Sequence, residues 1–452
     1  MKQSRFYKFV TIGLLVLFCA YIGYLLIRKH IDVQPDGQTI MRSDVLTYVL
    51  AADRMIQNAD IYFFSPGQET GYVYPPFYAF ANIPLTLAPP LAIDIFWYIF
   101  NIGLLIGTIR CGYILLTGEL FSALSSKDQW LYAGGSILLS IRYLVRGFQD
   151  ANVSMLLVFL IVYGLMSIER RKNSYGAIWM GVAAAIKVLP LVFLLYFIFF
   201  RKWKELFIVS VVFLFCTFMP IIYLGIPRFM ECMNSFIDYT RIQFSPAGLS
   251  RENFSFWGTL GRLFTHTDAQ LGPDGKPIFI NIANYPVLYV KSVIIGINAS
   301  LILLYGLTLY YFRKSYSDSR SHAGKEELFR MLPMLITLML GNLLSVLTED
   351  HHMIPLMMVY LFLLIGIRGH YFSTRIPVII TLGTGIASII LNYDIMVPLI
   401  GKLNYLILLG YSLPTFGVTL LLFALLLALL YYPGRLWRKE RERTVIANAV
   451  PV

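Results

Sequence analysis

The stretch AAAIKVLPLV, residues Ala183–Val192, interrupts a long apolar run and decides how the chain is organised. Lys187 would be costly at the centre of a membrane, and Pro190 removes a backbone hydrogen-bond donor. We therefore predict two short helices, 175–186 and 188–200, that form a hairpin. Each half has about 12 residues, or roughly 18 Å of helix, which is short for a bilayer. We expect this hairpin to border a water-filled cavity.

The composition around the hairpin is that of a membrane protein. The 452 residues are 58% hydrophobic and only 14% charged, too little charge to cover a soluble chain of this size. The apolar runs are continuous rather than alternating, so the sequence predicts an all-α polytopic membrane protein and excludes a β-barrel. We expect about 12 membrane segments, at 8–27, 92–116, 129–145, 152–168, 175–186, 188–200, 205–224, 287–312, 328–346, 353–368, 375–391 and 413–433.

The basic residues give the expected orientation. The net charge is +12, but lysine and arginine gather in short loops and at the tail, as orientation signals do, so no nucleic-acid partner is expected. Placing these loops in the cytoplasm leaves both termini inside and makes one membrane domain, 1–433, followed by a basic cytoplasmic tail, 434–452. The long polar loops then lie outside the cell membrane, at 28–91, 146–151, 225–286, 347–352 and 392–412.

The first external loop contains a candidate catalytic carboxylate. In RSDVLTYVLAADRM, Asp44 and Tyr48 are four residues apart and share one helical face. Asp53 lies on the opposite face, so we favour Asp44. The alternative is that Asp44, after Arg42-Ser43, merely caps the helix N-terminus.

Aromatic residues follow in the same loop. The stretch YVYPPFYAF, Tyr72–Phe80, contains two prolines after Tyr74, which predict a rigid extended turn. A sugar can stack on such rings. Aromatic residues are also common at membrane interfaces, and that interpretation of Tyr74 is the simpler one.

Three further polar stretches fall on the external side or at the hairpin tip. Asn152 lies beside the turn 146–151, and Lys187 either extends toward water or contacts an anion such as phosphate. The stretch Ser250–Phe264 contains Asn253, Ser255 and Arg262. The Arg262 guanidinium suits a phosphate but can equally pair with an acid.

The segment TEDHH places Glu349, Asp350, His351 and His352 at a membrane edge. Adjacent histidines on a helix point about 100° apart, so they are poorly placed to chelate one metal ion. We expect no metal site, and we expect the two imidazoles to have different roles, one structural and one facing the cavity.

In order along the chain, these residues resemble glycosyltransferase family 87, a family of polyprenyl-phosphate-sugar-dependent, mannosyltransferase-like enzymes of the GT-C superfamily. The similarity runs from about Asp44 to Pro355. It rests on Asp44 with Tyr48, Tyr74-Pro75-Pro76, Asn152, Gly176…Gly181…Lys187…Pro190, Asn253-x-Ser255…Gly258…Arg262 and Ser345…His351-His352.

The resemblance implies a GT-C membrane bundle whose first external loop carries interfacial helices and the catalytic aspartate. It implies a donor sugar, often mannose, on a polyprenyl phosphate in the outer leaflet of the cell membrane. The acceptor would be a glycolipid or glycan, and no cofactor is expected.

The chemistry of sugar transfer assigns roles to these side chains. A base must take the acceptor proton, and cations must hold the departing lipid phosphate. We expect Asp44 to be the base, with inversion at the sugar, and Lys187 and Arg262 to contact the phosphate. A histidine would lend a proton or a hydrogen bond. The expected site is catalytic Asp44, His351 and His352, with donor-binding Tyr48, Tyr74, Asn152, Lys187, Asn253, Ser255, Arg262 and Asp350.

Two other classes of function remain open at this stage. Charges such as Lys187 and Arg110 would suit a transporter or lipid flippase, although the sequence shows no two-fold repeat. A scaffold in an envelope-assembly complex would not require Asp44, Lys187 and His351 to converge.

Overall fold

A computed structural model describes most of the chain. The described residues are 43–62, 71–243, 252–268, 279–317, 325–372, 375–391 and 393–411, with a few single positions beyond them. Apart from those positions, the expected segments 8–27 and 413–433 and the tail 434–452 lie outside the described residues.

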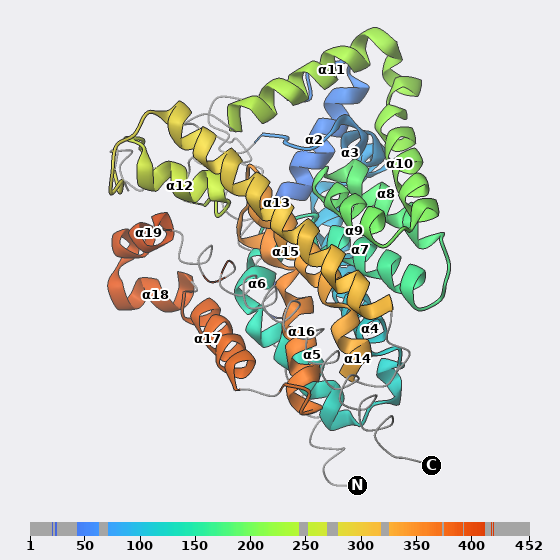
Figure 1. Ribbon diagram of the computed structural model, residues 1–452. Helices are drawn as coiled ribbons and strands as arrows, with labels where there is room; N and C mark the ends of the chain where they lie inside the picture. Colours follow the sequence, from blue (N-terminus) through green and yellow to red (C-terminus); the bar gives the residue numbers. More distant parts are fainter. Residues whose placement is uncertain are drawn as a thin grey trace, which may run out of the picture. The chain divides into compact units, whose positions relative to one another are not determined.

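Every element in the described residues is a helix, as the composition predicts (Figure 1). The first half of the chain contains α2 (Asp44–Ile56), α3 (Pro76–Ala81), η1 (Ile83–Leu87), α4 (Pro90–Thr117), η2 (Phe121–Ala123), α5 (Ser126–Leu139), α6 (Ile141–Gln149), α7 (Ser154–Glu169), α8 (Gly176–Ile186), η3 (Leu189–Val192) and α9 (Phe193–Phe199). The second half contains α10 (Trp203–Phe218), α11 (Ile221–Gln243), α12 (Phe256–Phe264), α13 (Val287–Ser317), α14 (Lys325–Arg330), α15 (Leu332–Leu344), η5 (Asp350–Met353), α16 (Leu356–Arg368), α17 (Ile376–Ile390), α18 (Tyr393–Ile400) and α19 (Lys402–Gly410).

Several helices are suited to a membrane. In the described part of the chain, four are long and apolar enough to cross one: Pro90–Thr117, Val287–Arg313, Glu327–Leu344 and Asp350–Arg368. A fifth would be α10 with α11, which are bent by 84°. Only 11% of the most apolar part of α13 is buried inside the protein, and its exposed side chains are mainly apolar. Such a surface suits contact with lipid, so the fold is consistent with a multi-pass membrane protein.

The chain divides into two compact units. Unit 1 contains residues 1–190, 207–248 and 349–364, and unit 2 contains residues 191–206, 249–348 and 365–452.

Close helix packing forms the centre of unit 1. Helix α7 packs against both α4 and α8. At the contact with α8, a Cβ atom on Gly176 would lie 2.3 Å from the carbonyl oxygen of Gly164, so only glycine allows the two backbones to approach this closely. Helix α2 packs on α3, η1 and α4, and α6 packs on η5. Helix α6 therefore lies beside the turn that contains the two histidines.

Unit 2 is built around α13 and α15. Helix α9 packs against both, and α12 packs against α13. The buried hydroxyl of Tyr305 donates to the carbonyl oxygen of Pro333 at 2.8 Å and contacts Thr337. A polar contact of this kind fixes the register of α13 on α15, because both groups are buried and need a partner.

The predicted break at Lys187 is confirmed, and two boundaries differ from the prediction. Helix α8 ends at Ile186, and Lys187 is extended, with φ −146° and ψ 127°. The expected segment 129–145 is instead two helices, α5 and α6, which meet at Ser140. The expected polar loop from 225 begins as helix: α11 continues to Gln243 through a kink at Gly225, where φ is 68°.

Candidate active site

Helix α2 places Asp44 at the start of its first turn. Ser43 is the N-cap residue, but its hydroxyl donates to the Asp94 carboxylate at 3.0 Å and makes no capping bond. The backbone N–H of Asp44 donates to the carbonyl oxygen of Asp150 at 2.7 Å. The start of α2 is therefore held against the turn that follows α6.

The Asp44 carboxylate contacts Asn152 rather than serving only as a helix cap. Its Oδ2 accepts a hydrogen bond of 2.5 Å from Asn152 Nδ2. The other end of this amide, Oδ1, accepts from the backbone N–H of Ser154 at 2.8 Å and from the Ser154 hydroxyl at 2.6 Å. Because a backbone N–H can only donate, these bonds fix which end of the Asn152 amide faces Asp44.

Two tyrosines surround this pair. Asn152 Nδ2 lies 3.2 Å from the Tyr48 hydroxyl and 3.5 Å from the Tyr74 hydroxyl, and the two hydroxyls lie 3.3 Å apart. Both rings are buried inside unit 1, which places Tyr74 in the site rather than in an exposed aromatic belt. Burial raises the pKa of Tyr48 and of Tyr74, so both hydroxyls remain protonated and able to donate.

Lys187 approaches the same tyrosine from the hairpin break. Its Nζ lies 5.7 Å from the centroid of the Tyr74 ring and 2.5 Å from His352 Nε2. Burial lowers the pKa of Lys187 to about 8, although the charges of Glu349 and Asp44 oppose this shift. The residue as a whole is half-buried.

The turn at Glu349–Met353 gives its two histidines different partners. Glu349 and His352 form a capping box, in which the backbone N–H of Glu349 donates to His352 Nδ1 at 3.0 Å. His351 lies between two acids, with Nδ1 3.6 Å from Asp150 and Nε2 3.4 Å from Glu349. The rings meet edge to face, with centroids 4.3 Å apart, so the two imidazoles present their nitrogens to different neighbours.

A buried arginine that the sequence interpretation missed holds this turn on α6. Arg142 Nε and Nη2 donate to the two carboxylate oxygens of Asp350 at 3.0 and 2.9 Å, and Arg142 is almost completely buried. Because both oxygens of Asp350 accept from one guanidinium, this geometry favours a structural role for Asp350 over donor binding. A signal was present: Arg142 is a charged residue inside the expected membrane segment 129–145.

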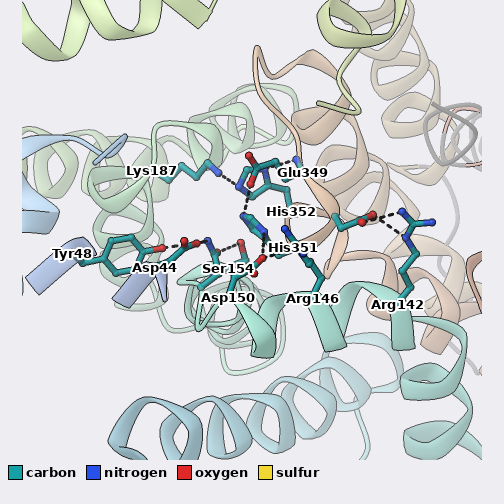
Figure 2. A network of polar contacts seen from close by, with 12 residues as sticks. Asp44, Tyr48, Arg142, Arg146, Asp150, Ser154, Lys187, Glu349, His351 and His352 are labelled. Carbon is teal, nitrogen blue, oxygen red and sulfur yellow. Dashed lines mark hydrogen bonds and ion pairs between the residues drawn. The ribbon is translucent and has the colours of Figure 1, made fainter. Parts of the chain in front are cut away.

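Figure 2 shows the resulting polar network of unit 1, in which Lys187, the two histidines and Asp44 lie around one region. Most of its members are candidates selected from the sequence. Arg142, Arg146, Asp150 and Ser154 were not selected as site residues, and the fold adds them to the network. Arg146 pairs with Asp150 at 2.9 Å. The residues selected from the sequence that unit 1 brings together are Asp44, Tyr48, Tyr74, Asn152, Lys187, Asp350, His351 and His352.

The three remaining candidates belong to unit 2 and contact its backbone. Asn253 Nδ2 and the Ser255 hydroxyl both donate to the carbonyl oxygen of Val346, at 2.8 and 3.0 Å. Asn253 Oδ1 accepts from the backbone N–H of Thr348 at 3.1 Å. Arg262 Nε donates to the carbonyl oxygen of Gly410 at 3.0 Å, and its side chain is fully buried.

Metal ligands do not gather in the described part of the chain. No group of three or more histidine, cysteine, aspartate or glutamate side chains is placed to hold a metal ion there. The polar network instead offers carboxylates, an amine, two imidazoles and several neutral hydrogen-bond donors. These groups suit proton transfer and the binding of an anion.

Comparison with known proteins agrees with this chemistry. The model of glycosyltransferase family 87 matches residues 72–348, more than half of the chain. A polyprenol-phosphate-mannose-dependent alpha-(1-2)-phosphatidylinositol pentamannoside mannosyltransferase from Mycolicibacterium smegmatis is 25% identical over 332 residues, which cover 72% of this chain and 70% of the relative. No solved structure matches the chain significantly. The chain therefore belongs to glycosyltransferase family 87 and is a glycosyltransferase.

Proposed function

We propose that the protein transfers a hexose, with mannose the first candidate, from a polyprenyl phosphate to a lipid or glycan acceptor. The family and the mannosyltransferase relative support this donor class. One observation about Tyr74 supports the proposal. Its hydroxyl contacts Asn152, which is the hydrogen-bond partner of the Asp44 carboxylate, and its ring faces the amine of Lys187. A base and a cation, the two groups that sugar transfer requires, therefore lie around one side chain.

Asp44 acts as the general base in this proposal. Asp44 is partly exposed, so an acceptor hydroxyl can approach its carboxylate. It takes the hydroxyl proton as the acceptor oxygen attacks the anomeric carbon. Attack from the face opposite the phosphate inverts that carbon. Tyr48 and Asn152 can also orient sugar hydroxyls, because both carry N–H or O–H groups beside the carboxylate.

Lys187 holds the phosphate of the donor lipid. Negative charge grows on this phosphate as its bond to the sugar breaks, and a nearby cation stabilises it. The His351–His352 turn supplies further hydrogen bonds. Arg262 was the second candidate cation, but its complete burial and its bond to Gly410 favour Lys187 as the principal contact.

We also propose that the site faces the outside of the cell membrane. The twelve expected segments, with both termini in the cytoplasm, place α2 and the turn at Glu349 outside and the loop at Lys172 inside. Labelling of single cysteines tests this arrangement at two exposed positions. Asn58→Cys should react with a membrane-impermeant reagent in intact cells, and Lys172→Cys should react only after permeabilisation. The reverse pattern would overturn the external site.

A panel of purified polyprenyl-phosphate sugars tests the function itself. The full-length protein is incubated with each donor and an acceptor extract, and free polyprenyl phosphate and the labelled product are measured. We expect release with the mannose donor and little with pentose donors. Failure of every donor to release lipid phosphate would contradict the proposed transfer reaction.

A further inference from the structure

The hydrogen bonds around His352 determine where its proton lies. The backbone N–H of Glu349 donates to Nδ1 at 3.0 Å, and a backbone N–H can only donate. Nδ1 therefore carries no proton in this arrangement. A neutral imidazole must then carry its proton on Nε2, the nitrogen that faces Lys187.

This tautomer limits the protonation of Lys187. Lys187 Nζ lies 2.5 Å from Nε2 of His352, within hydrogen-bonding distance, and a hydrogen bond has one proton between its two nitrogens. If His352 donates that proton, Lys187 must accept it through a lone pair, which an amine has and an ammonium lacks. In this arrangement Lys187 is a neutral amine and His352 is a neutral imidazole. The pair therefore holds one proton fewer than it would if Lys187 were an ammonium ion.

We propose that at alkaline pH the Lys187–His352 pair takes up one proton from solvent when an anionic lipid phosphate binds, which converts the lysine amine into an ammonium ion. The inference rests on the proposed function, because that function supplies the phosphate. No other bond forms or breaks in this step. The bound phosphate attracts the ammonium ion away from Nε2, and His352 keeps its proton and becomes a second donor toward the anion.

The surrounding charges explain why the empty site can hold the pair neutral and the occupied site cannot. Burial disfavours the ammonium form of Lys187, and the carboxylates of Glu349 and Asp44 favour it. The ring of His351 lies edge to face with that of His352, and the nitrogens of His351 face Asp150 and Glu349. The hydroxyl of Tyr74 stays protonated and adds no charge. Burial outweighs the two carboxylates and lowers the pKa of Lys187 to about 8, close to neutral pH. One added negative charge within a few ångströms shifts such a balance toward the ammonium form.

The sign of the pH dependence follows directly. The complex holds one more proton than the free protein, so affinity for the phosphate falls as the pH rises through the pKa of Lys187. Above that pH, the dissociation constant should rise about tenfold for each pH unit. Below it, Lys187 is already protonated in the free protein, and the affinity should level off.

Calorimetric titration with a short-chain polyprenyl-phosphate mannose, without acceptor, tests the uptake. This phosphodiester carries one negative charge that does not titrate near neutral pH, so any proton taken up enters the protein. At about pH 9, binding heats measured in buffers of different ionisation enthalpy should give an uptake approaching one proton. The variant Lys187→Arg keeps a cation that does not titrate in this range, so it should bind with no uptake. The neutral variant Lys187→Gln should bind weakly and independently of pH.

The outcomes separate the two proposals. Binding of the donor without proton uptake at about pH 9, or equal uptake by wild type and Lys187→Arg, would overturn the proton-uptake proposal alone. No binding of the donor by the folded wild type at any pH would contradict the proposed function instead.

Discussion

The Asp44 carboxylate accepts its hydrogen bond from Asn152, a residue 108 positions later in the chain. The amide cannot turn around without losing both bonds that Ser154 donates to its oxygen. The carboxylate is therefore oriented before an acceptor arrives. Orientation of this kind is how an enzyme lowers the entropy cost of proton transfer.

Asp44→Asn should abolish transfer. The amide keeps the size of the carboxylate, and the backbone bond from residue 44 to Asp150 remains, so α2 should begin at the same place. Without the general base, we expect kcat to fall by about 10²–10⁴. Release of polyprenyl phosphate is the measurement. Asp53→Asn is the matched control, because Asp53 bonds Gln57 on its own helix and should leave kcat unchanged. Full activity of Asp44→Asn would remove Asp44 from the mechanism.

Asn152→Ala should reduce kcat by about tenfold, because the carboxylate loses a hydrogen bond. The effect should nearly vanish when Asp44 is already asparagine, since Asn152 is expected to act through Asp44. A double-mutant cycle on kcat measures this coupling. Asn101→Ala controls for the loss of a buried amide, because the Asn101 side chain donates to the carbonyl oxygen of Trp97 within α4 and does not contact Asp44 through this bond. If the double variant instead lowers kcat by the product of the two single-variant factors, Asn152 acts on the substrate directly.

Two substitutions of Tyr74 should separate its hydroxyl from its ring. Tyr74→Phe keeps the ring that faces Lys187 but loses the hydroxyl contacts to Tyr48 and Asn152. We expect a lower kcat and a donor KM within about twofold of wild type. Tyr74→Leu also removes the cation–π contact, which is worth roughly 0.5–2 kcal/mol, so the donor KM should rise as well.

The pH profile supplies the check on this tyrosine. Burial raises the pKa of Tyr74, so its hydroxyl does not ionise in the working range and contributes no charge that changes with pH. The alkaline limb of kcat/KM should therefore be the same in wild type and Tyr74→Phe. A limb that disappears in Tyr74→Phe would mean that the hydroxyl itself titrates during catalysis.

Local patterns predicted part of this site and could not predict the rest. The four-residue spacing of Asp44 and Tyr48, the lysine and proline at the hairpin, and the adjacent histidines are all visible along the chain. Each depends on helix geometry or on the cost of charge in a membrane, which are local properties.

The partners of these residues are set by tertiary structure. Arg142 and Asp350 are 208 residues apart, and no local rule pairs them. The same is true of Asn253 and Ser255, whose polar groups hold the carbonyl of Val346 in unit 2. The sequence predicts a polar loop from residue 225, where the structure has the second part of helix α11, because polar and apolar residues are mixed there. That mixture also suits a helix with two different faces.

The bond between Arg142 and Asp350 should be important for stability. Arg142→Met leaves a carboxylate without its buried partner, and we expect a loss of about 3–5 kcal/mol. The double variant with Asp350→Leu should recover much of this loss, since no unpaired charge remains. Thermal unfolding of the purified protein measures both. Arg146→Met is the control: its pair with Asp150 is half-exposed and worth only about 0.3–0.5 kcal/mol. Equal losses from both single variants would argue against a special role for Arg142.

Gly258 should be required for the Asn253 loop of unit 2. A Cβ atom at this position would lie 2.4 Å from the carbonyl oxygen of Asn253, which is backbone and cannot move aside cheaply. Gly258 also donates its N–H to the Ser255 hydroxyl, the cap of α12, at 3.1 Å. Gly258→Ala should therefore destabilise the protein by about 1–3 kcal/mol. Gly103→Ala is the matched control in α4, where a Cβ atom meets nothing within 4 Å, and alanine there should be neutral or stabilising. Thermal unfolding that ranks the two variants equally would mean that the loop adjusts to the added methyl group.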